Sequence, residues 1–217
     1  MPSKARINAR NRMIPEVERI IDAHKELRKG RNGPDDQKSL LRSSILLLCG
    51  AWELYCESVT MEASKKLARY LDSPQKLPVS VQKQLVQSVH HENVHKSAPL
   101  KLAGEGWRKE YLKIVKFKCQ GLHTPKSEKL NKLFLDCLGL KNLSSHWPGE
   151  DGEIDRFVSL RGEIAHRGSE ATSVSRDEAT HYRALISKAI SNTDDAVYDF
   201  LKQSDVIGRA PWQKTGK

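Results

Sequence analysis

The sequence predicts an all-α protein, and three observations lead to this fold class. Apolar residues recur at three- and four-residue intervals along most of the 217 residues, whereas alternation with a period of two is scarce. Glycine and proline cluster between these periodic segments. One segment, from about Gln37 to Leu71, carries an almost unbroken apolar stripe and is long enough to be a central helix. We therefore predict an up-and-down helical bundle with additional helices.

Each predicted helix has its own start, stripe or stop signal. The first begins near Pro15, a residue that suits the first helical turn, and ends before Gly30. The third begins at Ser80, a capping residue, and ends before Pro99. The central helix between them is marked by Leu41, Ile45, Leu48, Trp52, Tyr55, Val59 and Ala63. The elements that follow are a basic segment Trp107–Lys118, a helix Leu130–Cys137 ended by Gly139, a helix from Glu153 to Gly168, and a helix to about Gln203 that Ser175 and Glu178 open as a capping box.

These elements suggest one domain with two loose ends. A chain of 217 residues suits one sizeable domain, which we place at residues 14–203. Residues 1–13 contain four basic and no acidic side chains, so we expect a basic flexible arm. Residues 204–217 lack apolar periodicity, and we expect a flexible tail.

The charge of the chain favours a polyanionic partner. The formal net charge is +10 and the pI about 9.5. Residues 96–132 hold ten Lys or Arg and three Glu, a local balance of +7. Nucleic acid is the first candidate partner and a membrane surface the second. A solvated basic face that binds nothing is the alternative.

The four cysteines favour a reducing compartment. Cys49, Cys56, Cys119 and Cys137 form no Cys-x-x-Cys pair and have no metal-ligand spacing. We expect buried, reduced thiols in a cytoplasmic protein, because the N-terminus carries no signal peptide. The longest apolar run, Ile45–Cys49, is far too short to span a bilayer, so we expect no membrane partner.

The segment Ser159–Ser169 carries the strongest candidate for catalysis. Arg161 and His166 stand five residues apart near the end of a predicted helix, with Glu163 between them and Arg167 after them. A neutral imidazole can take the proton of an RNA 2′-hydroxyl, and its cation can protonate a leaving oxygen. A guanidinium can hold the scissile phosphate. We predict Arg161 and His166 as catalytic, with Glu163 and Arg167 in support. A salt bridge at a helix end is the alternative.

The basic segment Trp107–Lys118 is the predicted RNA-binding element. In it, aromatic and aliphatic side chains are interleaved with cations, a pattern that suits a groove for a nucleic-acid strand. An amphipathic helix whose lysines reach out to solvent would have the same pattern. The predicted RNA-binding residues are Arg108, Lys109, Lys113, Lys116 and Lys118.

A zinc-hydrolase motif is present but poorly supported. His91-Glu92-Asn93-Val94-His95 fits His-Glu-x-x-His, in which two histidines four residues apart bind zinc and the glutamate is a general base. No third ligand stands at a usual spacing, because Glu105 and Glu110 follow a proline and glycine break. We keep zinc hydrolysis as a remote alternative and predict no metal ligand and no cofactor.

The motifs together resemble one family. Arg161-Gly-Glu-Ile-Ala-His166 is similar to the Arg-x4-6-His signature of the HEPN superfamily. Gly50-Ala-Trp-Glu-Leu-Tyr55 resembles a Trp-Glu-x-Tyr segment of its RiboL-PSP-type branch. Leu133-Phe134, Cys137-Leu-Gly-Leu140 and the Trp147 loop are similar to the segment before the signature helix of that branch. The resemblance covers about Gln37 to Gln203.

This resemblance implies a helical bundle, commonly a homodimer that joins two Arg/His pairs in one cleft. It also implies metal-independent RNA cleavage, often in toxin or antiviral-defence systems in which an antitoxin or another partner protein controls the domain. Arg161 and His166 match the catalytic pair. Gly162 departs from the family pattern, since a polar residue, usually Asn, follows the arginine there. Some members only bind, so a non-catalytic module that binds RNA or a protein is the alternative to an endonuclease.

Overall fold

The computed structural model of the chain describes residues 1–27, 34–91 and 98–214. The described residues contain helices and connecting segments but no strand, which confirms the all-α prediction. The α-helices are α1 (Lys4–Asn8), α2 (Ile14–Leu27), α3 (Pro34–Tyr70), α4 (Val79–His91), α5 (Gly106–Gln120), α6 (Ser127–Leu138), α7 (Glu153–Arg167) and α8 (Arg176–Lys202). The short elements are a π-helix, η1 (Ala9–Met13), and the 3-10 helices η2 (Pro74–Lys76), η3 (Ala98–Leu102), η4 (Leu143–His146) and η5 (Gly168–Glu170).

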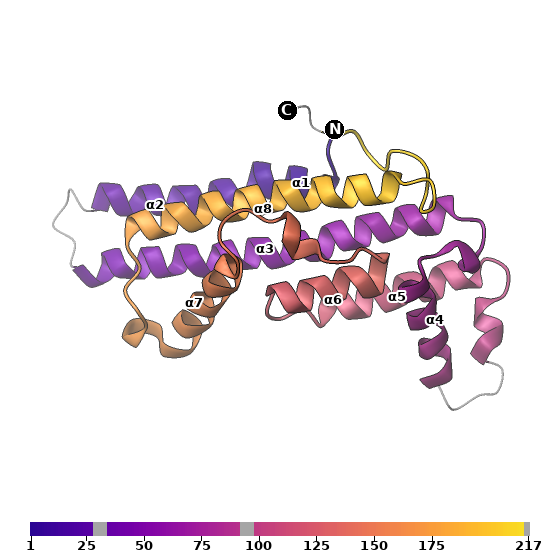
Figure 1. Ribbon diagram of the computed structural model, residues 1–217. Helices are drawn as coiled ribbons and strands as arrows, with labels where there is room; N and C mark the ends of the chain where they lie inside the picture. Colours follow the sequence, from indigo (N-terminus) through magenta and orange to yellow (C-terminus); the bar gives the residue numbers. More distant parts are fainter. Residues whose placement is uncertain (28–33, 92–97, 215–217) are drawn as a thin grey trace.

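Helix α3 is the axis of the fold, as its sequence predicts. Its 37 residues extend over about 55 Å. Helices α2 and α8 run along one side of α3, and α4, α5, α6 and α7 lie on the other side (Figure 1). All seven stripe residues from Leu41 to Ala63 are buried. The central helix is therefore covered on both sides, as its apolar stripe requires.

Two polar groups of α3 fix its neighbours in place. The Trp52 indole Nε1 donates to the Pro125 carbonyl at 3.1 Å, just before α6. The Tyr55 hydroxyl donates to the Ile190 carbonyl of α8 at 2.9 Å. Both side chains are fully buried, so these bonds satisfy polar atoms that would otherwise destabilise the core.

The local start and stop signals hold at the start of α8 and at the end of α6. The Ser175 hydroxyl accepts from the Glu178 amide at 3.1 Å and opens α8. Gly139 ends α6 with φ of 87°, where a Cβ would lie 2.3 Å from the Pro78 Cβ. Glycine is required there for the left-handed backbone and for the close approach of the segment before α4.

The N-terminal arm differs from the flexible segment that we expected. Residues 4–13 are helical, and Ala5 and Ala9 are buried. Arg6 pairs with Asp195 at 3.1 Å and with Asp194 at 3.7 Å, both on α8. Small side chains allow close packing, and the Arg6 guanidinium offsets the charge of the two carboxylates.

The segment after α8 is also packed. Val206 is buried, and the Gln213 amide donates to the Met1 carbonyl at 2.9 Å. The first residues of the chain and the segment after α8 accordingly lie side by side (Figure 1). No described helix combines the length and the apolar character needed to cross a lipid bilayer.

Candidate functional site

Helix α7 carries the predicted catalytic pair and is held from two sides. Its apolar residues Ile154, Phe157, Val158 and Ile164 are buried at helical spacing. Near its start, the Asp155 carboxylate accepts from the amide and the hydroxyl of Ser127 at 2.7 and 2.6 Å. This contact ties α7 to the first residue of α6. Helix α7 is therefore anchored to α6 and also packs against α3.

Arg161 points toward the middle of α3 and is not committed to a protein acceptor. The side chain is half-buried, and its Nε is buried without a hydrogen-bond partner among the described residues. Burial raises the pKa of the Cys49 thiol to about 12, and Arg161 opposes that rise. The guanidinium thus lies near Cys49 with hydrogen-bonding capacity unused. This is the state expected of an arginine that awaits an anion.

Glu53 is the carboxylate around which the neighbouring cations gather. Burial raises the pKa of Glu53, and Arg161, His123 and Lys129 oppose that rise in this order. These three groups come from α7, from the segment between α5 and α6, and from α6. The carboxylate and Arg161 are close enough to interact but do not form a direct ion pair. The cluster of Glu53, His123, Lys129 and Arg161 therefore has three basic groups and one acidic group.

His166 lies in the last turn of α7 and is exposed. It stands five positions after Arg161, which corresponds to about 140° of rotation and about 7.5 Å along the axis. The imidazole therefore does not share the face on which Arg161 meets α3. Within one chain the two side chains therefore lie on different faces of α7.

Glu163 and Arg167, the two predicted supporting residues, lie outside the Glu53 cluster. The Glu163 carboxylate accepts from the amide and the hydroxyl of Thr172, at 3.0 and 2.7 Å. These hydrogen bonds lower the pKa of Glu163. Arg167 is exposed at the end of α7. Glu163 therefore holds the segment after α7 and does not supply the polar group that Gly162 lacks.

The predicted RNA-binding residues of α5 fall into two groups. Arg108 donates to the carbonyls of Ala68 and Leu71 at the end of α3, at 2.5 and 2.8 Å, and Lys118 pairs with Asp136 at 3.0 Å. Lys109, Lys113 and Lys116 are exposed, and Lys113 lies 3.9 Å from Glu110. Arg108 and Lys118 are therefore engaged within the fold, whereas Lys109, Lys113 and Lys116 lie at the surface.

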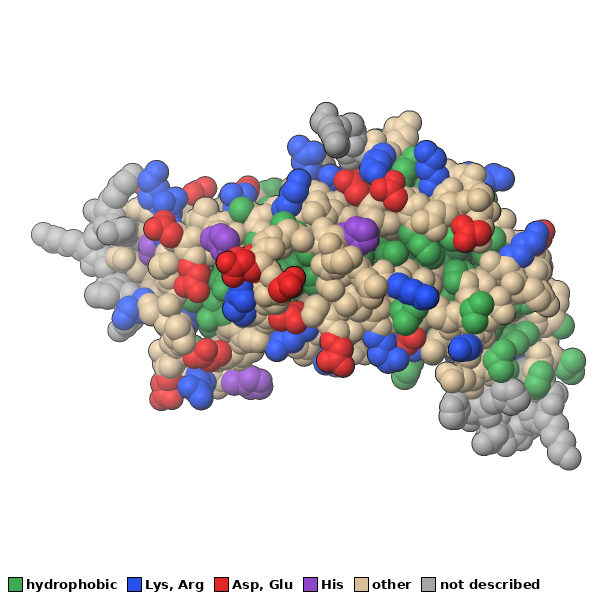
Figure 2. Space-filling model, in the orientation of Figure 1, with side chains coloured by type: hydrophobic (Ala, Val, Ile, Leu, Met, Phe, Trp, Pro, Cys, Tyr) green, Lys and Arg blue, Asp and Glu red, His purple; other side chains and the backbone are tan. Residues whose placement is uncertain are grey.

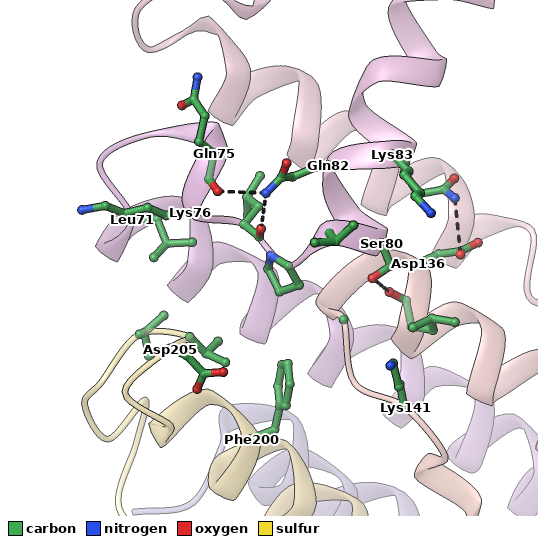
Figure 3. Close-up of a pocket in the computed structure, with 18 of the residues that line it drawn as sticks. Leu71, Gln75, Lys76, Ser80, Gln82, Lys83, Asp136, Lys141, Phe200 and Asp205 are labelled. Atoms are coloured by element: carbon green, nitrogen blue, oxygen red, sulfur yellow. Dashed lines mark hydrogen bonds between the residues drawn. The ribbon is translucent and has the colours of Figure 1, made fainter.

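A large hollow of about 1120 Å³ lies away from Arg161 and His166, the predicted catalytic pair (Figure 3). It is bordered by Leu71, which stands 18 positions, or about 27 Å along α3, from Glu53. Its polar groups bind one another: the Gln82 amide donates to the Gln75 carbonyl at 2.8 Å, and the Ser80 hydroxyl donates to the Leu135 carbonyl at 2.8 Å. Despite its large volume, this hollow is therefore not the candidate functional site.

Sequence reasoning missed three members of the Glu53 cluster. Glu53 stands inside the Trp-Glu-x-Tyr segment, so the signal was present without an assigned role. His123 and Lys129 have no local signal, because only the packing of α6 against α3 brings them near Glu53.

No metal site is found in the part of the chain that the structure describes, where no three His, Cys, Asp or Glu side chains converge. The His-Glu-x-x-His candidate, residues 91–95, falls almost wholly outside the described residues. The four cysteines are free and buried. The cluster beside Arg161 offers one carboxylate among cations, a donor set that suits an anion and not a metal ion.

Comparison with known families identifies the chain. The sequence matches the RiboL-PSP-HEPN family over residues 11–199. The chain belongs to this family. No curated protein and no solved structure matches it. The match spans α3 and α7 and so includes Glu53, Arg161 and His166, and it connects this RiboL-PSP-HEPN domain with an RNA-related role.

Proposed function

We propose that the protein is a metal-independent RNA endonuclease. The observation that carries the proposal is the state of Arg161, whose Nε is unpartnered beside the Glu53 cluster, on the helix that ends in exposed His166. A guanidinium among additional cations suits a phosphodiester. A solvent-accessible imidazole suits proton transfer near neutral pH. Family membership supports the same assignment.

In the proposed reaction, neutral His166 takes the proton of an RNA 2′-hydroxyl. The 2′-oxygen attacks the adjacent phosphorus, the bond from phosphorus to the 5′-oxygen breaks, and a proton is delivered to that leaving oxygen. The products are a 2′,3′-cyclic phosphate and a free 5′-hydroxyl. Arg161 holds the non-bridging phosphate oxygens and offsets the charge that grows on them. Glu53 faces Arg161 and keeps the guanidinium near α3 when RNA is absent.

A homodimer would supply both proton transfers. One imidazole cannot be neutral base and cationic acid at the same instant, whereas two copies of His166 can divide the roles. The α3 surface beside Arg161 suits such a contact, since Leu46 and Leu54 are 37% and 48% exposed and a Cβ on Gly50 would meet nothing within 4 Å. Sedimentation of the active protein tests this arrangement. A species that is monomeric at every concentration and still cleaves would exclude it.

The decisive experiment is cleavage of a mixed RNA in EDTA by the wild type, Arg161→Ala and His166→Ala. We expect the wild type to cleave and each variant to lose about 100-fold or more of the rate. Both side chains lie near the surface, so thermal melts should stay close to the wild type. Cleavage that needs a metal, or that survives either substitution, would refute the mechanism.

The second candidate function is a binding module without catalysis. Gly162 motivates it, because the residue after Arg161 has no side chain and Glu163 is engaged with Thr172. This alternative predicts that purified protein retards RNA in a gel without degrading it, and that His166→Ala leaves the retardation unchanged. RNA degradation that depends on His166 excludes it.

A further inference from the structure

Phe117 is an aromatic side chain that the core does not use. It is 76% exposed on the outer face of α5, opposite the buried Trp107, Tyr111 and Val115. A phenylalanine left in water forgoes about 2 kcal/mol of burial. Single exposed apolar residues are common, but here they gather. Of the seven large apolar residues described as exposed, four belong to α4, η3 and α5: Val79, Val86, Leu100 and Phe117.

This gathering is visible at one end of the molecule. Apolar side chains cluster at the lower right of Figure 2, where α4 and α5 lie in Figure 1. There Phe117 and Ile114 line a groove of about 500 Å³ between the two helices. The opposite wall carries the amides Gln84 and Gln87 and the hydroxyl of Ser88. A flat apolar face bordered by amides matches a nucleobase, which has a π-face and a hydrogen-bonding edge.

The charges around Phe117 select an anionic ligand. Lys109, Lys113 and Lys116 follow one another at spacings of four and three on the exposed side of α5. Residues 79–91 and 106–120 together contain six Lys or Arg and one Glu, a balance of +5. Lysines beside an exposed aromatic ring are the combination that binds a sugar–phosphate strand while stacking its bases.

The groove also lies in line with the Glu53 cluster. Helix α5 runs antiparallel to α3, because Arg108 near its start contacts Ala68 while the Cys119 Sγ near its end lies 3.7 Å from the Glu57 carbonyl. Glu57 is four residues, or about 6 Å along α3, from Glu53. Helices α5 and α7 lie on the same side of α3 (Figure 1). A strand that follows α5 toward its C-terminal end therefore approaches the cluster beside Arg161.

We propose that the outer face of α5 binds single-stranded RNA, with one unpaired base stacked on Phe117 and the flanking phosphates on Lys113 and Lys116. This assignment rests on the proposed ribonuclease function and specifies its substrate class. Duplex RNA is disfavoured, because the faces of paired bases are already stacked within the helix. The groove thus selects unpaired segments for cleavage.

The test uses fluorescence anisotropy in the His166→Ala background, so that RNA stays intact. The probes are an oligouridylate of about 12 nucleotides and the same strand in a duplex. Phe117→Ala is expected to weaken single-strand binding by about 5- to 100-fold, whereas Phe117→Trp should keep it. Val79→Ala is the matched control, since Val79 is 67% exposed but lies outside the groove. Duplex binding should be weaker and should not respond to Phe117→Ala.

Three results would overturn the inference: unchanged affinity in Phe117→Ala, full affinity in Phe117→Leu, or a duplex bound as tightly as the single strand. Full RNA affinity in Phe117→Leu would indicate an apolar docking surface for a protein, since leucine has no π-face on which a base could stack. A different result would refute the proposed ribonuclease function, namely a wild type that neither binds nor cleaves any RNA. Cleavage by the wild type together with an unresponsive Phe117 refutes the α5 site alone.

Discussion

Arg108 of α5 lies at the C-terminal end of α3, and Arg161 of α7 lies near its middle. The two arginines differ in their hydrogen-bond partners. Arg108 of α5 donates to the Ala68 and Leu71 carbonyls, pairs with Glu105 and lies over the Trp107 ring at 4.8 Å. The Nε of Arg161 in α7 has no hydrogen-bond partner among the described residues, and the guanidinium interacts with Glu53 by charge without a direct ion pair. Both arginines were predicted from the sequence to contact RNA, but their contacts in the structure differ. An arginine that ends a helix by binding its last carbonyls stabilises the fold, and one without acceptors is available to a ligand.

The largest expected effects are opposite in the two arginine variants: Arg108→Ala loses stability, and Arg161→Ala loses cleavage. Arg108→Ala removes two charged hydrogen bonds from the end of α3, so we expect a loss of roughly 2 kcal/mol in the free energy of unfolding. This corresponds to about 4–8 °C in Tm for a chain of this size. Cleavage per folded molecule should stay near the wild type. Arg161→Ala should show the reverse, with cleavage lost and Tm nearly kept.

Lys109→Ala is the control for this pair, because it removes an adjacent exposed cation without touching α3. It should leave Tm unchanged. The measurements are thermal melts by circular dichroism and single-turnover cleavage. If Arg108→Ala kept its Tm and lost cleavage, Arg108 would belong with Arg161 as an RNA contact, and the comparison would fail.

A second expected effect concerns the missing polar side chain beside Arg161. A Cβ at Gly162 meets nothing within 4 Å, so asparagine fits there without clash. If an amide at this position binds the phosphate or the imidazole, Gly162→Asn should raise the cleavage rate by about tenfold, the value of one hydrogen bond to a charged group. Gly162→Ala is the matched control and should add about 0.5–1 kcal/mol of stability from helix propensity alone. An equal rate increase in both variants would assign the effect to the rigidity of α7.

The smallest effect is a pH-dependent one at Glu163. Hydrogen bonds from Thr172 lower the pKa of Glu163 in the folded chain, so its charge stabilises the fold above the usual glutamate pKa of about 4.3. That contribution is lost as the pH falls through the lowered value. Glu163→Gln should therefore reduce Tm slightly at pH 7, and the difference should vanish in acid.

Glu170→Gln removes a carboxylate from the neighbouring exposed segment and should leave Tm unchanged at both pH values. If the Tm of Glu163→Gln stayed below that of the wild type at low pH, the shape of the side chain at position 163, and not its charge, would position Thr172. In either case cleavage should change little, because Glu163 lies outside the Glu53 cluster.

Much of the fold could be predicted from the sequence, because helices are encoded locally. The stripe of α3, the Ser175 cap and the Gly139 stop each depend on residues within a few positions of one another. The arm and the tail differed from expectation because their partners are distant. Ser3 and Arg6 bind Asp194 and Asp195, about 190 positions away. Burial raises the pKa of Asp194, and the contacts with Ser3 and Arg6 oppose that rise.

The sequence by itself determined the helical class through its apolar periodicity and the family through the match over residues 11–199. It also placed Arg161 and His166 on one helix, through their spacing along the chain. Only the tertiary structure decided which cations are free. Arg108 and Lys118 are bound to α3 and α6, while Arg161 meets Glu53, His123 and Lys129 from three separate segments. Side-chain charge is a property of sequence, but whether a charge is already paired depends on which helices pack together.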